Sequence, residues 1–180
     1  MSGDRNAYET GAQKIIPAVL LYAFFEDQVL MIHRNQKDNA QKKDWHEGKW
    51  NGLGGKLELG ETALQCAVRE FQEESGCATT GKQWNWVGQL SFPNFKPHKK
   101  EDWYVTVYRT ELSKNQTEAM ITQNKEGTLH WVPSCELLSL NLWEGDRQFL
   151  PMVLNKRCFE GVFFYLDGKL DRFFLNPILS

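Results

Sequence analysis

Short runs of β-branched, aliphatic and aromatic residues alternate with polar, glycine-containing or proline-containing segments along most of the chain. Residues 16–23 form an apolar, β-prone run, residues 24–28 carry turn chemistry, and residues 29–33 are apolar again, which predicts a β-hairpin. Asp167 and Gly168 are typical of a tight turn in a second, closing hairpin. The remaining strands are expected, in chain order, at residues 84–92, 103–109, 127–132, 162–166 and 170–175.

The clearest helical pattern covers residues 62–75 and ends at Gly76, a natural helix stop. A shorter helical turn is expected at residues 135–138. Asp146 is placed to cap a second long helix that ends near Lys156. The apolar stripe of the first helix consists of Ala63, Leu64, Ala67, Val68 and Phe71.

Three segments lack a regular apolar period. Residues 35–48 are polar and predict a loop, residues 50–57 predict a glycine-rich strand and turn, and residues 93–102, which contain two prolines, predict a loop between strands. Strands mixed with helices along the chain favour an α+β fold in which a sheet lies between helices. We expect residues 1–14 to be a flexible lead-in and residues 15–180 to form a single domain.

Composition narrows the class of protein. Hydrophobic residues make up 41% and charged residues 24% of the 180 residues, as in ordinary soluble proteins. A net charge of −2 gives no general attraction to nucleic acid or to a membrane surface, so no stable nucleic-acid or membrane partner is expected. The cysteines form no CxxC pair, the polar N-terminus carries no secretory signal, and no apolar run reaches membrane-spanning length. These features favour the cytoplasm, with Cys66 and Cys77 as buried thiols.

Candidate chemistry is concentrated on the first helix. Glu70, Glu73 and Glu74 are spaced i, i+3 and i+4, so their carboxylates share one face in the last turn. Like charges repel there, and the helix dipole also disfavours anions. A helix that accepts both costs indicates a bound cation, and clustered carboxylate oxygens suit Mg²⁺, with Mn²⁺ as a possible substitute. The alternative is a solvated helix face that carries ordinary ion pairs.

The segment around these glutamates resembles the Nudix box. That pattern is glycine, five residues, glutamate, seven residues, Arg-Glu, a hydrophobic residue, any residue, Glu-Glu, any residue, glycine and a hydrophobic residue. The positions that match are Gly55, Glu61, Arg69, Glu70, Phe71, Glu73, Glu74 and Gly76, while Cys77 in the final hydrophobic place is a mild departure. The resemblance implies the Nudix fold, an α/β/α sandwich with a mixed sheet, and hydrolysis of a nucleoside diphosphate linked to another group, with a divalent metal.

The resemblance also implies roles for individual residues. Glu70, Glu73 and Glu74 would hold the metal together with the backbone carbonyl of Gly55, and Arg69 would orient a catalytic glutamate rather than form only a surface pair. Glu61 would tie the loop to the helix. Lys56 would either touch phosphate or remain an exposed lysine. The general base would be Glu73, Glu74 or a glutamate outside the box, for which Glu126 is the best candidate.

A second set of residues resembles the animal MutT-type branch of the family, which acts on oxidised purine nucleoside triphosphates such as 8-oxo-dGTP. This resemblance implies that Asn51 hydrogen-bonds the base, that Trp143 stacks on it, that Asp146 meets its edge and that Glu126 helps to bind metal. The alternatives are a loop-turn asparagine, a core tryptophan and a helix-capping aspartate. The segments that carry it are residues 50–56, 87–89, Trp131, 142–146 and 149–151.

Two departures bear on specificity. Gly145 stands where that branch has the first of two adjacent aspartates, and the loop at residues 35–48 is longer. Residues that are candidates for the pocket are Trp45 as an aromatic lining, Lys42, Lys43 and Lys49 as phosphate contacts, and Phe92, Trp103 and Tyr104 as either lining or core.

The sequence thus predicts an Mg²⁺-dependent pyrophosphohydrolase, monomeric or dimeric, that converts a purine nucleoside triphosphate such as 8-oxo-dGTP to the monophosphate and pyrophosphate. The rivals are a Nudix hydrolase of dinucleoside polyphosphates, nucleotide sugars or RNA 5′ ends, and a non-catalytic nucleotide sensor.

Overall fold

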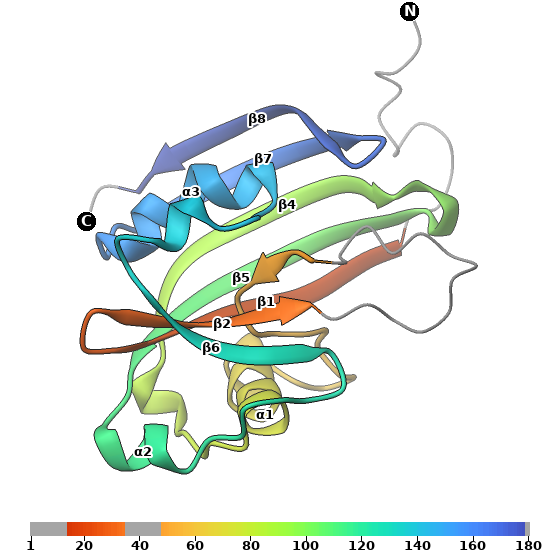
Figure 1. The fold of residues 1–180 in the computed structure, drawn as a ribbon. Coiled ribbons are helices and arrows are strands. Elements are labelled where there is room, and N and C mark those ends of the chain that lie inside the picture. The colour runs from red at the N-terminus through yellow and green to blue at the C-terminus, as the bar shows by residue number, and fades with distance from the viewer. Residues whose placement is uncertain (1–13, 35–47, 179–180) are drawn as a thin grey trace, which may run out of the picture.

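A computed structural model of the chain describes residues 14–34 and 48–178. These residues form one mixed eight-stranded sheet (Figure 1). Its order is β3-β2-β1-β5-β4-β7-β8, and β6 pairs with β2. The pairs β1–β5 and β4–β7 are parallel, and the others are antiparallel. The strands are β1 (Lys14–Phe25), β2 (Gln28–Arg34), β3 (Trp50–Asn51), β4 (Asn85–Lys96), β5 (Glu101–Glu111), β6 (Gly127–Pro133), β7 (Phe159–Leu166) and β8 (Lys169–Pro177).

Helices pack on both faces of this sheet. Along β1, Tyr22 belongs to the apolar cluster that contains helix α3 (Glu144–Leu154), whereas Leu21 and Ala23 belong to the cluster that contains helix α1 (Ala63–Ser75). Because successive side chains of a strand point to opposite faces, the two clusters lie on opposite sides of the sheet. This arrangement confirms the predicted α+β sandwich. No helix among the described residues is long and apolar enough to cross a membrane.

Helix α1 begins and ends where the sequence predicts. Thr62 and Gln65 form a capping box, in which Thr62 Oγ1 accepts the Gln65 N–H and Gln65 Oε1 accepts the Thr62 N–H. Gly76 adopts the left-handed conformation at φ 73° and donates its N–H to the Gln72 carbonyl. Both ends of the helix that carries the glutamates are therefore fixed by local hydrogen bonds.

Several sequence predictions are wrong in detail. Residues 93–102 are not a long loop, because β4 and β5 extend to Lys96 and Glu101 around the short 3₁₀ helix η3 (Pro97–Lys99). Asp146 does not cap α3, since Trp143 holds that position and Asp146 lies inside the first turn. The glycine-rich segment contributes only the two residues of β3 and isolated bridges to β1. The short elements that complete the chain are η2 (Gly81–Gln83), the unpredicted α2 (Lys114–Glu118) and η4 (Leu137–Ser139).

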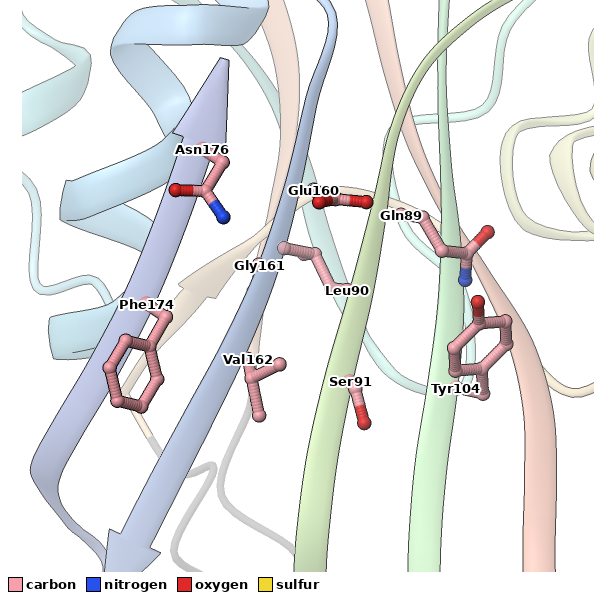
Figure 2. Close-up of a pocket in the computed structure, with 9 residues that line it drawn as sticks. All are labelled: Gln89, Leu90, Ser91, Tyr104, Glu160, Gly161, Val162, Phe174 and Asn176. Atoms are coloured by element: carbon pink, nitrogen blue, oxygen red, sulfur yellow. The ribbon is translucent and has the colours of Figure 1, made fainter. Parts of the chain in front are cut away.

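One hollow lies on the sheet face that also packs against α1. It has a volume of about 230 Å³ over β4, β5, β7 and β8, and Figure 2 shows the side chains that line it. Tyr104 and Phe174 are 51% and 61% exposed there. The neighbours of Tyr104 in β5, Trp103 and Val105, line a larger cavity on the opposite face.

Candidate functional site

A cavity of about 550 Å³ collects residues from eight elements and the loops beside them. Nine of the predicted site residues line it, and Glu74 lies behind its wall. Carboxylates and aromatic rings therefore share one space, as a ligand with both phosphates and a flat base requires. The predicted residues in the lining are Asn51, Gly55, Lys56, Arg69, Glu70, Glu73, Glu126, Trp143 and Asp146.

Arg69 donates hydrogen bonds to three carboxylates. Its guanidinium donates two hydrogen bonds of 2.8 Å to Glu61, one of 2.9 Å to Glu70 Oε1 and a longer one of 3.4 Å to Glu73 Oε2. The same guanidinium donates to the backbone carbonyl of Lys56 at 3.1 Å. A planar fork that holds this many acceptors fixes the loop before α1 against the helix.

Glu61 is the anchor of that fork. The hydrogen bonds from Arg69 lower the pKa of Glu61 to about 2, so this carboxylate stays charged and paired. Its Oε2 also accepts the Glu58 N–H at 2.9 Å. These contacts match the structural role expected for Glu61 and leave Glu70 and Glu73 to face the cavity.

Glu70 lies against the backbone of Gly55. A Cβ atom on Gly55 would stand 2.3 Å from Glu70 Oε1, so a larger residue would displace the carboxylate from the position in which Arg69 holds it. Burial raises the pKa of Glu70, and the Glu73 and Glu126 carboxylates raise it further, although Arg69 opposes the shift. The Gly55 carbonyl accepts the Val19 N–H at 2.8 Å and a long hydrogen bond of 3.9 Å from the Cys66 thiol, a weak donor that a stronger ligand can displace.

Glu74 is the most buried of the three helix glutamates, at 7% exposed. Burial raises its pKa to about 8, and repulsion from Glu126 and Glu70 adds to the shift. Its Oε2 accepts the Gly54 N–H at 2.8 Å, while Gly54 adopts φ +140° and would meet the Val19 carbonyl if it carried a Cβ. The glycine pair thus lets the loop approach both Glu70 and Glu74.

Glu126 joins this group from a segment remote in sequence. It forms an ion pair with Arg34 at the end of β2 and lines the same cavity as Glu70 and Glu73. Asn124 positions it, since Asn124 Oδ1 accepts the Glu126 N–H while the Asn124 amide donates to the Glu74 carbonyl. The sequence pattern alone did not single out Arg34 or Asn124.

These residues suit a divalent cation. No group of three or more His, Cys, Asp or Glu side chains within residues 14–34 and 48–178 is already gathered in a metal-binding arrangement. The donor set is nevertheless that of a hard cation, because it consists of carboxylate oxygens. Burial, and after it repulsion between the carboxylates, raises the pKa values of Glu70 and Glu74. A positive ion would relieve that repulsion, and the cradle at Gly55 keeps the Glu70 carboxylate accessible.

Two polar groups, Asn51 and Asp146, lie in the aromatic part of the cavity. Asn51 Oδ1 is buried and accepts no hydrogen bond from the described residues. Asp146 is 8% exposed, and burial raises its pKa to about 7 although Lys49 opposes the shift. A carboxyl group poised near neutrality can act as donor or acceptor, and a buried oxygen without a partner favours a ligand that donates to it.

Trp143 presents its ring beside these groups. Lys49 Nζ lies 5.3 Å from the centroid of the ring and donates to the Leu142 carbonyl at 3.1 Å. Tyr165 meets the indole edge to face at 5.9 Å between centroids. Contacts on these sides hold the Trp143 ring at the cavity, where an indole offers a broad surface for stacking.

Two lysines lie over Trp103 at another part of the lining. The Nζ atoms of Lys56 and Lys96 are 5.1 and 4.6 Å from the centroid of the Trp103 ring. Phe95 packs edge to face against Trp103, and Phe92 packs against Phe95. The two ammonium groups therefore border an otherwise aromatic wall. Both can attract a polyanionic ligand over a short range.

The structure also corrects and extends the predicted pocket. Of the two alternatives left for the strand aromatics, lining or core, Phe92 and Trp103 line the cavity and also pack against the core. Tyr104 does not line it, because its side chain points to the opposite face of β5. Phe95, Lys96 and Tyr165 line it without having been predicted, since strand pairing rather than a sequence motif brings them there. The predicted contacts of Trp45, Lys42 and Lys43 lie outside the described residues.

Comparisons with known proteins agree with this fold. The NUDIX domain family matches residues 14–153. The chain is 30% identical over 129 residues to the oxidized purine nucleoside triphosphate hydrolase of Mus musculus, covering 71% of this chain and 76% of the mouse protein. The protein of the same name from Danio rerio is 30% identical over 137 residues, covering 73% and 83%. The crystal structure of a MutT protein from Bacillus halodurans is similar with a TM-score of 0.74 and 26% identity, covering 89% of this chain and 97% of that one.

Proposed function

The chain belongs to the Nudix family of hydrolases, enzymes that act on acid anhydrides, and from this premise we propose that it is a divalent-metal-dependent pyrophosphohydrolase of purine nucleoside triphosphates. An oxidised form such as 8-oxo-dGTP is the leading substrate. The observation that carries the proposal is the single cavity in which the glutamates of α1, the unpaired Asn51 Oδ1 and the buried Asp146 carboxyl group meet. The products would be the nucleoside monophosphate and pyrophosphate.

Five residues are proposed to hold the metal, which we take to be Mg²⁺. When bound, such an ion neutralises phosphate charge and lowers the pKa of a water molecule, as phosphoryl-transfer chemistry requires. Arg69 would keep the Glu70 and Glu73 carboxylates turned to the cavity, because it bonds to both and is itself anchored on Glu61. The proposed ligands are the Gly55 carbonyl, Glu70, Glu73, Glu74 and Glu126.

A glutamate of the same set would take the proton of the attacking water. Glu73 suits this role, because its side chain is 57% exposed and, within residues 14–34 and 48–178, its one side-chain hydrogen bond is the 3.4 Å contact to Arg69. Glu74 and Glu126 are held by the Gly54 N–H and by Arg34. Attack is proposed at the β phosphorus, where the O–P bond to the α phosphate breaks and the nucleoside monophosphate leaves.

The base would bind between the polar and aromatic groups of the same cavity. Trp143 would stack on the purine, Asn51 Oδ1 would accept a hydrogen bond from its edge, and Asp146 would donate or accept there. Lys56 would meet the phosphates from its position over Trp103. The match to named hydrolases of oxidized purine nucleoside triphosphates supports this assignment.

The test compares pyrophosphate release from 8-oxo-dGTP by the wild type and by Glu73→Gln, each with Mg²⁺ and with excess EDTA. Removal of one metal-facing carboxylate is expected to lower kcat about 100- to 1,000-fold, and the chelator is expected to abolish wild-type turnover. Glu160→Gln is the matched control, because Glu160 lines the hollow on the far face shown in Figure 2. Wild-type turnover by Glu73→Gln, or turnover in EDTA, would refute the proposal.

A further inference from the structure

Tyr165 reaches into the cavity from β7 and contacts the first turn of α3. Its hydroxyl oxygen accepts the backbone N–H of Gly145 at 2.9 Å. Its ring contacts Trp143 edge to face and lies 6.0 Å from the centroid of Phe95. The tyrosine is thereby fixed at its ring and at its hydroxyl oxygen, which gives the hydroxyl a defined place beside the proposed base pocket.

The hydroxyl group keeps one unused function. A phenol has one donor hydrogen and accepts through its lone pairs, and Gly145 occupies only a lone pair. Among the residues that the structure describes, none accepts the Tyr165 hydroxyl hydrogen. Burial and the nearby Asp146 carboxylate raise the pKa of Tyr165, so the hydroxyl remains protonated at neutral pH. The cavity therefore contains a fixed donor without an acceptor.

Gly145 is part of the same arrangement. A Cβ atom at this position would stand 2.6 Å from the Tyr165 hydroxyl oxygen and 3.0 Å from Phe163 Cδ1. Any larger residue would therefore push the hydroxyl away from the N–H that holds it. The Tyr165 hydroxyl thus occupies the space that a side chain at position 145 would need.

We propose that Tyr165 is a specificity-determining residue whose hydroxyl donates a hydrogen bond to a carbonyl oxygen of the purine ring. The carbonyl lies at C6 in guanine and hypoxanthine, at C8 in oxidised adenine and at both positions in oxidised guanine. Adenine offers neither. The inference rests on the proposed function, and it adds that the pocket favours oxopurines through a donor outside the Nudix box.

Binding of nucleoside monophosphates without metal tests the inference independently of turnover. Dissociation constants are measured by titration calorimetry in EDTA for dGMP, 8-oxo-dAMP, 8-oxo-dGMP and dAMP, with the wild type and Tyr165→Phe. Loss of a neutral hydrogen bond is expected to weaken binding roughly 3- to 10-fold for ligands that carry the recognised carbonyl and to leave dAMP unchanged. A loss confined to dGMP and 8-oxo-dGMP identifies C6, and a loss confined to the two 8-oxo ligands identifies C8.

Two further variants separate recognition from a structural effect. Gly145→Ala displaces the hydroxyl without removing it and is expected to give the same ligand pattern. Tyr104→Phe makes the same chemical change on the far face, where Figure 2 shows Tyr104, and is expected to leave all four constants unchanged. Equal losses for all four ligands in Tyr165→Phe, or no loss at all, would overturn the inference.

The outcomes also distinguish this inference from the proposed function. If the wild type hydrolyses 8-oxo-dGTP and binds the monophosphates while Tyr165→Phe binds them equally well, only the role of Tyr165 is refuted. If the wild type binds none of the four monophosphates, the inference falls, while the proposed function is still decided by the turnover of 8-oxo-dGTP with Mg²⁺.

Discussion

Replacing Asp146 by asparagine is expected to change how the stability of the protein depends on pH. The carboxyl group is 8% exposed, and burial raises its pKa from 3.8 to about 7. Asparagine has nearly the same shape and cannot ionise. The comparison of the two proteins therefore isolates the cost of a charged carboxylate at this position.

The size of the effect follows from the two pKa values. Because the folded-state pKa lies above the unfolded-state value, the native protein holds a proton that the unfolded chain releases between about pH 4 and pH 7. Stability is therefore full below about pH 4 and is lost as the pH rises through about 7. At about 1.4 kcal/mol for each pH unit, the rise of the pKa from 3.8 to about 7 lowers the free energy of unfolding by about 4 kcal/mol, of which about 2.5 kcal/mol is lost between pH 5 and pH 8.

Urea unfolding at intervals between pH 5 and pH 8 measures how much of the free energy of unfolding is lost through Asp146. The wild type is expected to lose about 2.5 kcal/mol more than Asp146→Asn across that range, since all other titrating groups cancel in the comparison. Asp167→Asn is a suitable control, because Asp167 is exposed in the β7–β8 turn at φ 50°, a conformation that asparagine tolerates. Parallel pH profiles for the wild type and Asp146→Asn would refute the reasoning.

Two further substitutions test the two halves of the cavity. Gly55→Ala places a Cβ 2.3 Å from Glu70 Oε1 and is expected to raise the Mg²⁺ concentration for half-maximal activity about 10- to 100-fold. An unchanged Mg²⁺ titration would show that metal binding does not depend on the space that Gly55 leaves for Glu70. Trp143→Ala is expected to raise KM for the nucleotide about 10-fold or more, because stacking on an aromatic ring contributes about 1–3 kcal/mol per base, whereas Trp143→Phe retains part of that affinity. Equal KM values for the alanine and phenylalanine variants would argue against stacking.

Local patterns predicted the parts of the fold that depend on neighbouring residues. The capping box of Thr62 and Gln65 and the glycine at position 76 define α1, so its limits and the shared face of its glutamates could be read from the sequence. The burial of Cys66 and Cys77 was also expected and is confirmed. Leu64 is an exception in the apolar stripe, since it is 36% exposed and Cys66 takes the buried place.

Features that depend on pairing between remote segments were not predictable in the same way. The two prolines of residues 93–102 suggested a loop, but pairing with β5 extends β4 to Lys96 and brings Lys96 over Trp103. Tyr165 is an ordinary strand aromatic by sequence, and only the packing of β7 against α3 places its hydroxyl on Gly145. The face that Tyr104 occupies likewise depends on the register of β5.

The most direct test of the proposed function measures kcat/KM with Mg²⁺ for 8-oxo-dGTP, dGTP, dATP and a dinucleoside polyphosphate, side by side, with the released products identified. The account predicts that 8-oxo-dGTP is hydrolysed with the highest kcat/KM and yields 8-oxo-dGMP and pyrophosphate. Preference for the dinucleoside polyphosphate, or turnover of none of the four, would contradict it.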